Sequence, residues 1–191
     1  QVTIEGRTFP LVPPFLVLAT QNPIEQEGTY PLPQAQLDRF LLKVFIGYPD
    51  EGDEQAMVKQ VTAGSVGDQL DTSAIRPLLQ AADILLLQSH VARLEVDDEI
   101  VNYAVRIVRA AREWNGIEVG PGPRGPIAML RAARAEAFLQ ERDFVTPDDI
   151  KAAVPPVLRH RIRLTTDMEI EGYTPDDVLA DLLENIPAPR R

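Results

Sequence analysis

The sequence predicts a short α/β segment over residues 1–48 followed by an all-α domain over residues 49–191. Two runs, at 15–20 and 41–46, carry apolar residues at consecutive positions, which is typical of strands buried on both faces. From Gly47 onward the pattern changes to helices that begin with acidic residues. We therefore expect sheet strands in the first part of the chain and a helical domain in the rest.

The first part is expected to hold three further features besides the two strands. A hairpin over residues 2–9 is predicted because apolar residues flank a turn at Glu5-Gly6. Pro and Gly residues predict a loop over 22–33, after the first strand. A short helix over 34–39 then leads into the second strand.

The helical domain is divided by its capping residues. Helices are expected over residues 50–61, 74–92 (one or two helices), 97–114 and 126–141, with a short extended link at 94–96. Two more helices are predicted to begin at Thr146-Pro147-Asp148-Asp149 and Thr174-Pro175-Asp176-Asp177. In both runs Thr is the N-cap, Pro takes the first helical position and acids lie in the first turn. We interpret the acidic pairs as helix starts rather than as metal ligands.

The composition excludes several classes of function. The 191 residues include no Cys, which excludes disulfides, Cys-zinc sites and thiol catalysis, and the two His leave little material for a metal site. A net charge of -10 argues against nonspecific binding to nucleic acid or to an anionic membrane. No apolar run approaches the ~18 residues that cross a bilayer, and no signal peptide is recognised. We expect a cytoplasmic protein without membrane insertion, and the absence of an initiator Met indicates a chain that begins within a longer protein.

Three polar residues are placed where they could meet a ligand. Asn22 follows the first predicted strand, and ligands bind beyond the carboxyl ends of the strands in an open α/β sheet. Arg39 ends the predicted short helix, just before the second strand. Arg124 lies in the run GPGPRGP immediately before a helix, where backbone N–H groups and an Arg suit an anion.

Each of these residues also has an ordinary structural interpretation. Asn22 precedes a proline and can simply initiate a turn. Arg39 can pair with Asp38 or Glu27 at the surface, and Arg124 can pair with a nearby acid. The sequence has no G-x-x-x-x-G-K-[ST] phosphate loop, no predicted strand that ends in an acidic cluster for Mg²⁺, and no arguable Ser/His/Asp arrangement.

Taken together, these residues resemble the MoxR family of AAA+ ATPases. The matching runs are Val2-Thr3-Ile4 with Pro14-Phe15, ATQNPIEQEGTYPLPQAQLDRF at 19–40, Gly47-Tyr48-Pro49, GPGPRG at 120–125, Val145-x-Pro147-Asp148-Asp149, Pro156-Val157-Leu158-x-His160-Arg161-Ile162 and Glu169-x-Glu171-Gly172. The similarity covers nearly the whole chain, and the run at 19–40 is far more specific than a short motif. The resemblance implies an α/β remnant of a AAA+ core, with a hairpin and two sheet strands, followed by an all-α lid domain.

The resemblance also implies roles for individual residues. Asn22 matches the sensor 1 residue, which positions the attacking water or senses the γ-phosphate. Arg39 matches the arginine finger, which acts in trans across a ring interface, and Arg124 matches the sensor 2 Arg of the lid. Tyr48 and Pro49 match the hinge between core and lid, close to the adenine, and are the candidate nucleotide-binding residues.

The family further implies ATP with Mg²⁺, a hexameric ring and a chaperone-like role on partner proteins, often ones with von Willebrand factor A domains. This chain departs from the family at Gln34, where Glu is usual, and in the GPGPRG loop, where Ser and Ala are usual. The Walker A and Walker B segments of the family are expected upstream of residue 1. Because those segments hold the phosphates and Mg²⁺, we expect the chain alone neither to bind nor to hydrolyse ATP.

Two other interpretations stay open on the sequence. One is a non-catalytic helical module for protein interaction, in which Asn22 and Arg39 only stabilise turns. The other is a related AAA+ subunit of the magnesium-chelatase type. A phosphate loop and an acidic strand end upstream of this chain would separate the ATPases from the non-catalytic module.

Overall fold

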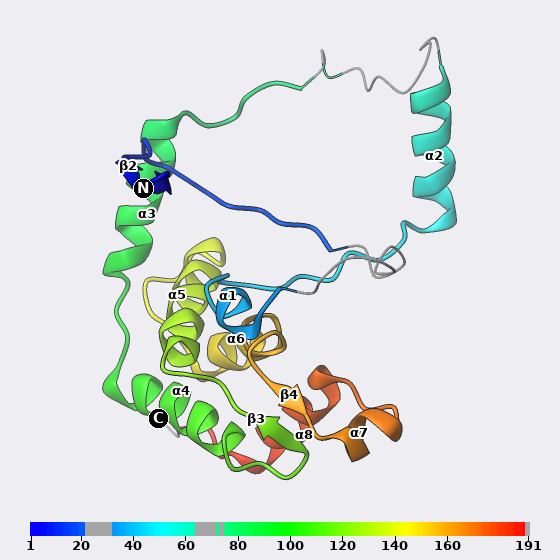
Figure 1. The fold of residues 1–191 in the computed structure, drawn as a ribbon. Coiled ribbons are helices and arrows are strands. Elements are labelled where there is room, and N and C mark those ends of the chain that lie inside the picture. The colour runs from blue at the N-terminus through cyan, green and yellow to red at the C-terminus, as the bar shows by residue number, and fades with distance from the viewer. Residues whose placement is uncertain (22–31, 64–71, 73–74, 190–191) are drawn as a thin grey trace.

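The core of the molecule lies in its C-terminal half. The structure, a computed structural model, describes residues 1–21, 32–63, 72 and 75–189. Among these residues, every buried hydrophobic side chain lies at or after Ile100. In Figure 1 the helices after residue 98 gather into one packed group, whereas most of the earlier residues run in an open arc. The buried core therefore lies within the predicted helical domain and begins well after the predicted boundary between residues 48 and 49.

The predicted hairpin is confirmed. Strand β1 (Val2–Ile4) pairs antiparallel with strand β2 (Arg7–Phe9), with Val2 opposite Phe9. Glu5 and Gly6 form the turn with φ values of 48° and 77°. Two positive φ values are those of a type I′ turn, whose twist matches the strands that it joins.

The two predicted sheet strands do not form among the described residues, so this part of the prediction is wrong. Residues 15–20 and 41–46 have no regular secondary structure, and their apolar side chains are exposed, Leu18 by 84% and Ile46 by 93%. A buried strand needs hydrogen-bonded strands beside it. No described strand lies beside either run, and the second run bonds to the helical domain instead.

Three helices precede the core: α1 (Gln34–Leu37), α2 (Glu51–Thr62) and α3 (Ala81–Arg93). The Asp50 side chain caps α2 by accepting from the backbone N–H of Asp53 at 2.9 Å, as its acidic start predicts. The α3 helix is shorter than the predicted span 74–92, because the Asp83 carboxylate accepts from the backbone N–H of Gln80 and fixes the start there. No residue of α1, α2 or α3 is buried.

Four helices make the core: α4 (Asp98–Ala111), α5 (Arg124–Leu139), α6 (Pro147–Leu158) and α8 (Pro175–Asn185). One face of α4 is buried at helical spacing, by Ile100, Tyr103, Ala104, Ile107, Val108 and Ala111. Small buried residues on α5, including Ala128, Ala133 and Ala137, let α6 pack closely against it. Figure 1 shows α5 and α6 side by side, and α4 and α8 complete the packed group.

The predicted starts of α6 and α8 are confirmed as capping boxes, formed by Thr146 with Asp149 and by Thr174 with Asp177. Three short elements were not predicted: strands β3 (Ile117–Val119) and β4 (Arg163–Leu164), which pair antiparallel, and helix α7 (Thr166–Ile170). Strands of this length are too short to show an alternating pattern. In the part of the chain that the structure describes, no helix is long and apolar enough to cross a membrane.

Candidate functional site at the end of helix α6

The C-terminal end of α6 binds the segment that follows α1. A helix leaves its last four carbonyl groups without intrahelical partners. The backbone N–H of Lys43 donates to the Pro156 carbonyl at 2.8 Å. The Arg161 guanidinium donates to the Val157 carbonyl. The Lys43 bond joins the first part of the chain to the helical domain, and the Arg161 bond places that guanidinium at the same end of α6.

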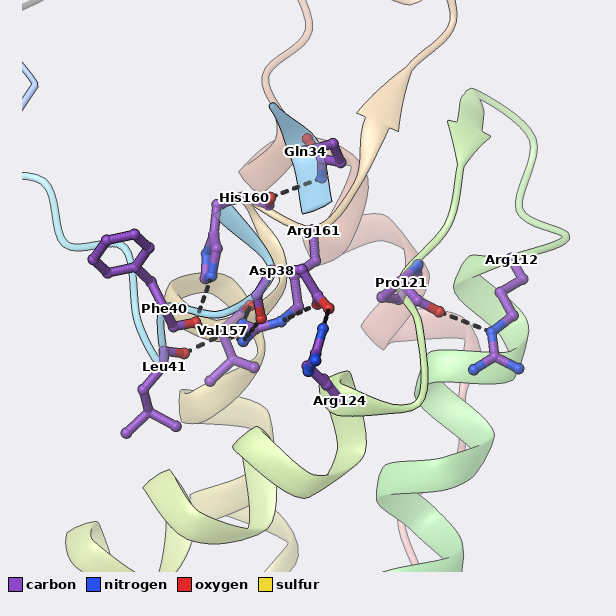
Figure 2. Close-up of polar contacts among 10 residues, drawn as sticks. All are labelled: Gln34, Asp38, Phe40, Leu41, Arg112, Pro121, Arg124, Val157, His160 and Arg161. Carbon is purple, nitrogen blue, oxygen red and sulfur yellow. Dashed lines mark hydrogen bonds and ion pairs between the residues drawn. The ribbon is translucent and has the colours of Figure 1, made fainter. Parts of the chain in front are cut away.

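Arg161 lies at the centre of this junction and is only 4% exposed. As Figure 2 shows, its Nη2 donates to the carbonyls of Asp38 at 3.1 Å and Phe40 at 2.6 Å, and its Nη1 donates to the Leu41 carbonyl at 3.2 Å. Its Nε donates to Oδ1 of Asp38 at 3.1 Å. Burial lowers the pKa of the Arg161 guanidinium, and the Asp38 carboxylate opposes that shift. The rigid fork of five N–H donors allows one side chain to bind several carbonyls at once.

His160 is the second buried group of the junction. Its Nε2 lies 3.1 Å from the Phe40 carbonyl, so we assign the proton to Nε2. Burial lowers the pKa of the imidazole, although the hydrogen bond to Phe40 acts in the opposite direction. Its Nδ1 is buried and has no partner among the described residues, so a second proton would have no acceptor. The backbone carbonyl of His160 accepts from the side-chain amide of Gln34 at 2.9 Å, which ties α1 to the same place.

Asp38 joins two Arg residues of very different exposure. Its Oδ1 accepts from Arg161 and its Oδ2 accepts from Nη1 of Arg124 at 2.9 Å (Figure 2). The Arg161 side chain is 2% exposed, whereas the Arg124 side chain is 58% exposed. Breaking a buried ion pair is costly, but an exposed pair contributes only about 0–1 kcal/mol. Arg124 can therefore exchange Asp38 for another anion far more easily than Arg161 can.

Arg39 follows Asp38 directly and is exposed. Its backbone N–H donates to the Gln36 carbonyl at 3.1 Å and closes the end of α1. Within the described ranges, its side chain makes no hydrogen bond or ion pair. Of the two predicted partners of Arg39, Asp38 is not paired with it, because Asp38 pairs with Arg124 and Arg161 instead. The other, Glu27, lies outside the described residues.

The loop at 120–125 fixes the start of α5, where Arg124 is the first residue. A Cβ added at Gly120 would lie 2.6 Å from the Cα of Arg112, so only Gly fits there. The Nε of Arg112 donates to the Pro121 carbonyl at 2.9 Å, as Figure 2 shows. At Gly120 the loop therefore lies directly against the backbone at the end of α4.

The remaining predicted site residues lie elsewhere. Asn22 is outside the described residues. Tyr48 is 91% exposed and Pro49 is also exposed, in the link that leads to α2. Over the ranges that the structure describes, no group of three or more His, Asp or Glu side chains could hold a metal ion. The junction thus holds Arg124 on the Asp38 carboxylate and leaves the neighbouring Arg39 exposed.

Sequence reasoning did not identify Asp38, His160 and Arg161 as parts of this site. A partial signal was present, because His160-Arg161 directly follows the end of a helix, where cations interact favourably with the last carbonyls. The contact itself was not visible, since Asp38 and Arg161 are 123 residues apart.

Comparison with known proteins relates both ends of the chain to ATPase domains. Residues 1–42 match a family described as "ATPase family associated with various cellular activities (AAA)", and residues 109–182 match one described as "AAA lid domain". The crystal structure of a candidate ATPase from Cytophaga hutchinsonii matches with a TM-score of 0.87 and 34% identity, over 99% of this chain and 58% of that chain. The predicted fold class, a AAA+ remnant followed by a helical lid, is confirmed by this match.

Curated bacterial proteins are similar along nearly the whole chain. It is 39% identical to the uncharacterized protein YeaC of Bacillus subtilis over 98% of its length, and 38% identical to "Chaperone MoxR1" of Mycobacterium tuberculosis over 99%. The chain spans 57% and 51% of these two relatives, about half of each. A magnesium-chelatase subunit of Arabidopsis thaliana is a weaker match, 30% identical over 78% of the chain. Because both parts of the chain match ATPase families and nearly its whole length matches these relatives, the chain belongs to the MoxR family of AAA+ ATPases.

Proposed function

We propose that this chain is the finger-and-lid part of a ring-forming ATPase that binds ATP with Mg²⁺ and hydrolyses it. The observation that carries this proposal is that two exposed cations belong to one junction, Arg39 next to Asp38 in the sequence and Arg124 bound to the Asp38 carboxylate. Arg39 has no side-chain partner among the described residues, and Arg124 is 58% exposed and paired with Asp38. Accessible cations stabilise the charge that develops on a phosphoryl group during transfer.

In this proposal Arg39 and Arg124 both act on the phosphate groups of a nucleotide. Rings form through head-to-tail contacts, so a surface that carries Arg39 can meet the nucleotide of a neighbouring subunit. Arg39 is then the arginine finger and Arg124 the sensor 2 residue. Asn22 is the sensor 1 residue, and Tyr48 and Pro49 form the hinge near the adenine.

The described residues fit the anionic end of a nucleotide better than its metal ion. They supply two accessible guanidinium groups but no set of metal ligands. The proposal therefore assigns the phosphate loop and the Mg²⁺ ligands to parts of the complete protein outside the described residues. We propose that the 191-residue chain alone does not hydrolyse ATP.

For the complete protein we propose a cytoplasmic hexamer with a chaperone-like role in remodelling partner proteins, including ones with von Willebrand factor A domains. Support comes from family membership and from the relative named as a chaperone. The alternative is a non-catalytic interaction module, in which the Arg124–Asp38 pair is purely structural. A magnesium-chelatase type of subunit would use the same ATPase chemistry with a different partner, and the weaker similarity makes it the less favoured choice.

The test is Arg39→Ala in the complete protein. Turnover should fall by about 10³–10⁵, the range for arginine fingers, while the Kd for ATP stays unchanged. The matched control is Arg131→Ala, which removes another exposed Arg, on α5, and should leave both quantities unchanged. Equal losses of binding and turnover would contradict a finger that acts in trans, and an unchanged turnover would favour the non-catalytic module.

A further inference from the structure

The two peptide carbonyls on either side of Arg39 are held by one buried guanidinium. Nη2 of Arg161 donates to the carbonyls of Asp38 at 3.1 Å and Phe40 at 2.6 Å (Figure 2). The imidazole of His160 bonds to the same Phe40 carbonyl at 3.1 Å. The backbone that carries Arg39 is therefore fixed on both sides, while the Arg39 side chain is exposed.

The helix that ends next to Arg39 cannot supply this order. The α1 helix has only four residues, Gln34–Leu37, and none of them is buried. Isolated helices of this length are unstable in water, since most helical stability comes from tertiary packing. Bonds from α6 and the residues that follow it are therefore what keep this segment in place.

The bonds that Arg161 makes around Arg39, called the clamp here, require an arginine. Besides the two carbonyls that flank Arg39, the Arg161 guanidinium binds the Leu41 carbonyl and the Asp38 carboxylate. A lysine would keep the charge, but its single ammonium group cannot reach these carbonyls and the carboxylate together in a fixed plane.

We propose that Arg161 is a positioning residue for Arg39. It fixes the backbone on both sides of Arg39 to the helical lid, so that Arg39 and Arg124 move as one body. This inference rests on the proposed role of Arg39 as an arginine finger. It implies that movement of the lid also moves the finger, because the clamp joins the segment around Arg39 to the end of α6.

The test is the steady-state ATPase activity of the complete protein with Arg161→Lys, Arg39→Ala and the double substitution. A displacement of about 1 Å at a reacting centre can cost about 10²-fold, so Arg161→Lys should lower kcat by about 10–10²-fold with KM for ATP unchanged. The double variant should be no slower than Arg39→Ala alone, because Arg161 acts only through Arg39. The control Arg163→Lys, in the exposed pair with Glu118, should leave kcat and KM unchanged.

The outcomes separate this inference from the proposed function. If Arg39→Ala leaves kcat unchanged, the finger assignment fails. If Arg39→Ala abolishes turnover but Arg161→Lys has the wild-type kcat, the positioning role alone is wrong. A double variant that is slower by the product of the two single effects also overturns it, since independent effects add as free energies.

A second variant covers the case in which Arg161→Lys does not fold. Asp38→Asn keeps an oxygen acceptor for Nε of Arg161 but weakens the bond by removing the charge. It should lower kcat, and this effect should vanish in the Arg39→Ala background. An effect that persists in that background would show that Asp38 acts through Arg124 instead, and a wild-type kcat would overturn the proposal.

Discussion

Gly120→Ala is expected to destabilise the helical domain at the loop that carries Arg124. The added Cβ would lie 2.6 Å from the Cα and 2.9 Å from the Cγ of Arg112, and 3.1 Å from the Ala111 carbonyl oxygen. Carbon atoms in contact are normally about 3.5–4.0 Å apart, so the overlap with the Cα is roughly 1 Å. That Cα belongs to the backbone at the end of α4 and cannot rotate away, as the tip of a side chain could.

The expected loss is about 1–3 kcal/mol in the free energy of unfolding, which is the usual range for overpacking. At about 2–4 °C per kcal/mol for a chain of this size, the Tm of the 191-residue chain should fall by roughly 2–12 °C. The assay is thermal unfolding followed by circular dichroism.

Gly122→Ala is the matched control in the same loop. A Cβ at Gly122 meets nothing within 4 Å, so the change in stability should stay within about 0.5 kcal/mol. The reasoning is refuted if Gly120→Ala melts with the wild type, or if both variants lose the same stability.

Two further predictions concern pH and capping. Because burial lowers the pKa of His160, the folded chain binds fewer protons than the unfolded chain below about pH 6.5. The free energy of unfolding should therefore decrease as the pH falls below that value, by at most about 1.4 kcal/mol per pH unit. In urea unfolding at about pH 7.5 and 5.5, His160→Gln should remove that dependence, and an unchanged dependence would contradict the assignment. Burial alone would raise the pKa of Asp149, but hydrogen bonds from Arg142 and Thr146 outweigh it and hold that pKa below its ordinary range. Asp149→Asn should therefore cost about 1.5–3 kcal/mol near neutral pH, a loss that shrinks as the pH falls from about 4 through the folded-state pKa. Asp177→Asn, in the exposed box of α8, should cost less, and equal losses would contradict this account.

The helical domain could be predicted because its signals are local. The Thr-Pro-Asp-Asp runs at 146–149 and 174–177 contain every residue that caps α6 and α8. The buried face of α4 follows a helical period within one segment of sequence. Such features need no knowledge of the rest of the chain.

The strands at 15–20 and 41–46 could not be settled in this way. Consecutive apolar residues indicate that a segment is suited to a buried strand, but strand formation depends on neighbouring strands elsewhere in the protein. Among the described residues those neighbours are absent. The pattern therefore identifies apolar segments correctly and still predicts the wrong local structure.

The candidate site was predictable only in part. Arg39 and Arg124 stood out because each lies at a helix end, and the structure finds both exposed. Their connection through Asp38 depends on contacts between distant parts of the chain. Gln34 shows the same limit. The sequence marks it only as a departure from the usual Glu, whereas in the structure its amide donates to the His160 carbonyl, which a carboxylate could not do.

The central claim is that Arg39 completes a site on a neighbouring subunit, and a mixing experiment tests it most directly. In the complete protein, Asn22→Ala and Arg39→Ala should each abolish ATP hydrolysis when assayed alone. Mixed in equal amounts, they should recover about a quarter of the wild-type rate, because in a head-to-tail ring about a quarter of the interfaces combine an intact Asn22 with an intact Arg39. A mixture of assembled rings that stays as inactive as its two components would contradict a site shared between subunits.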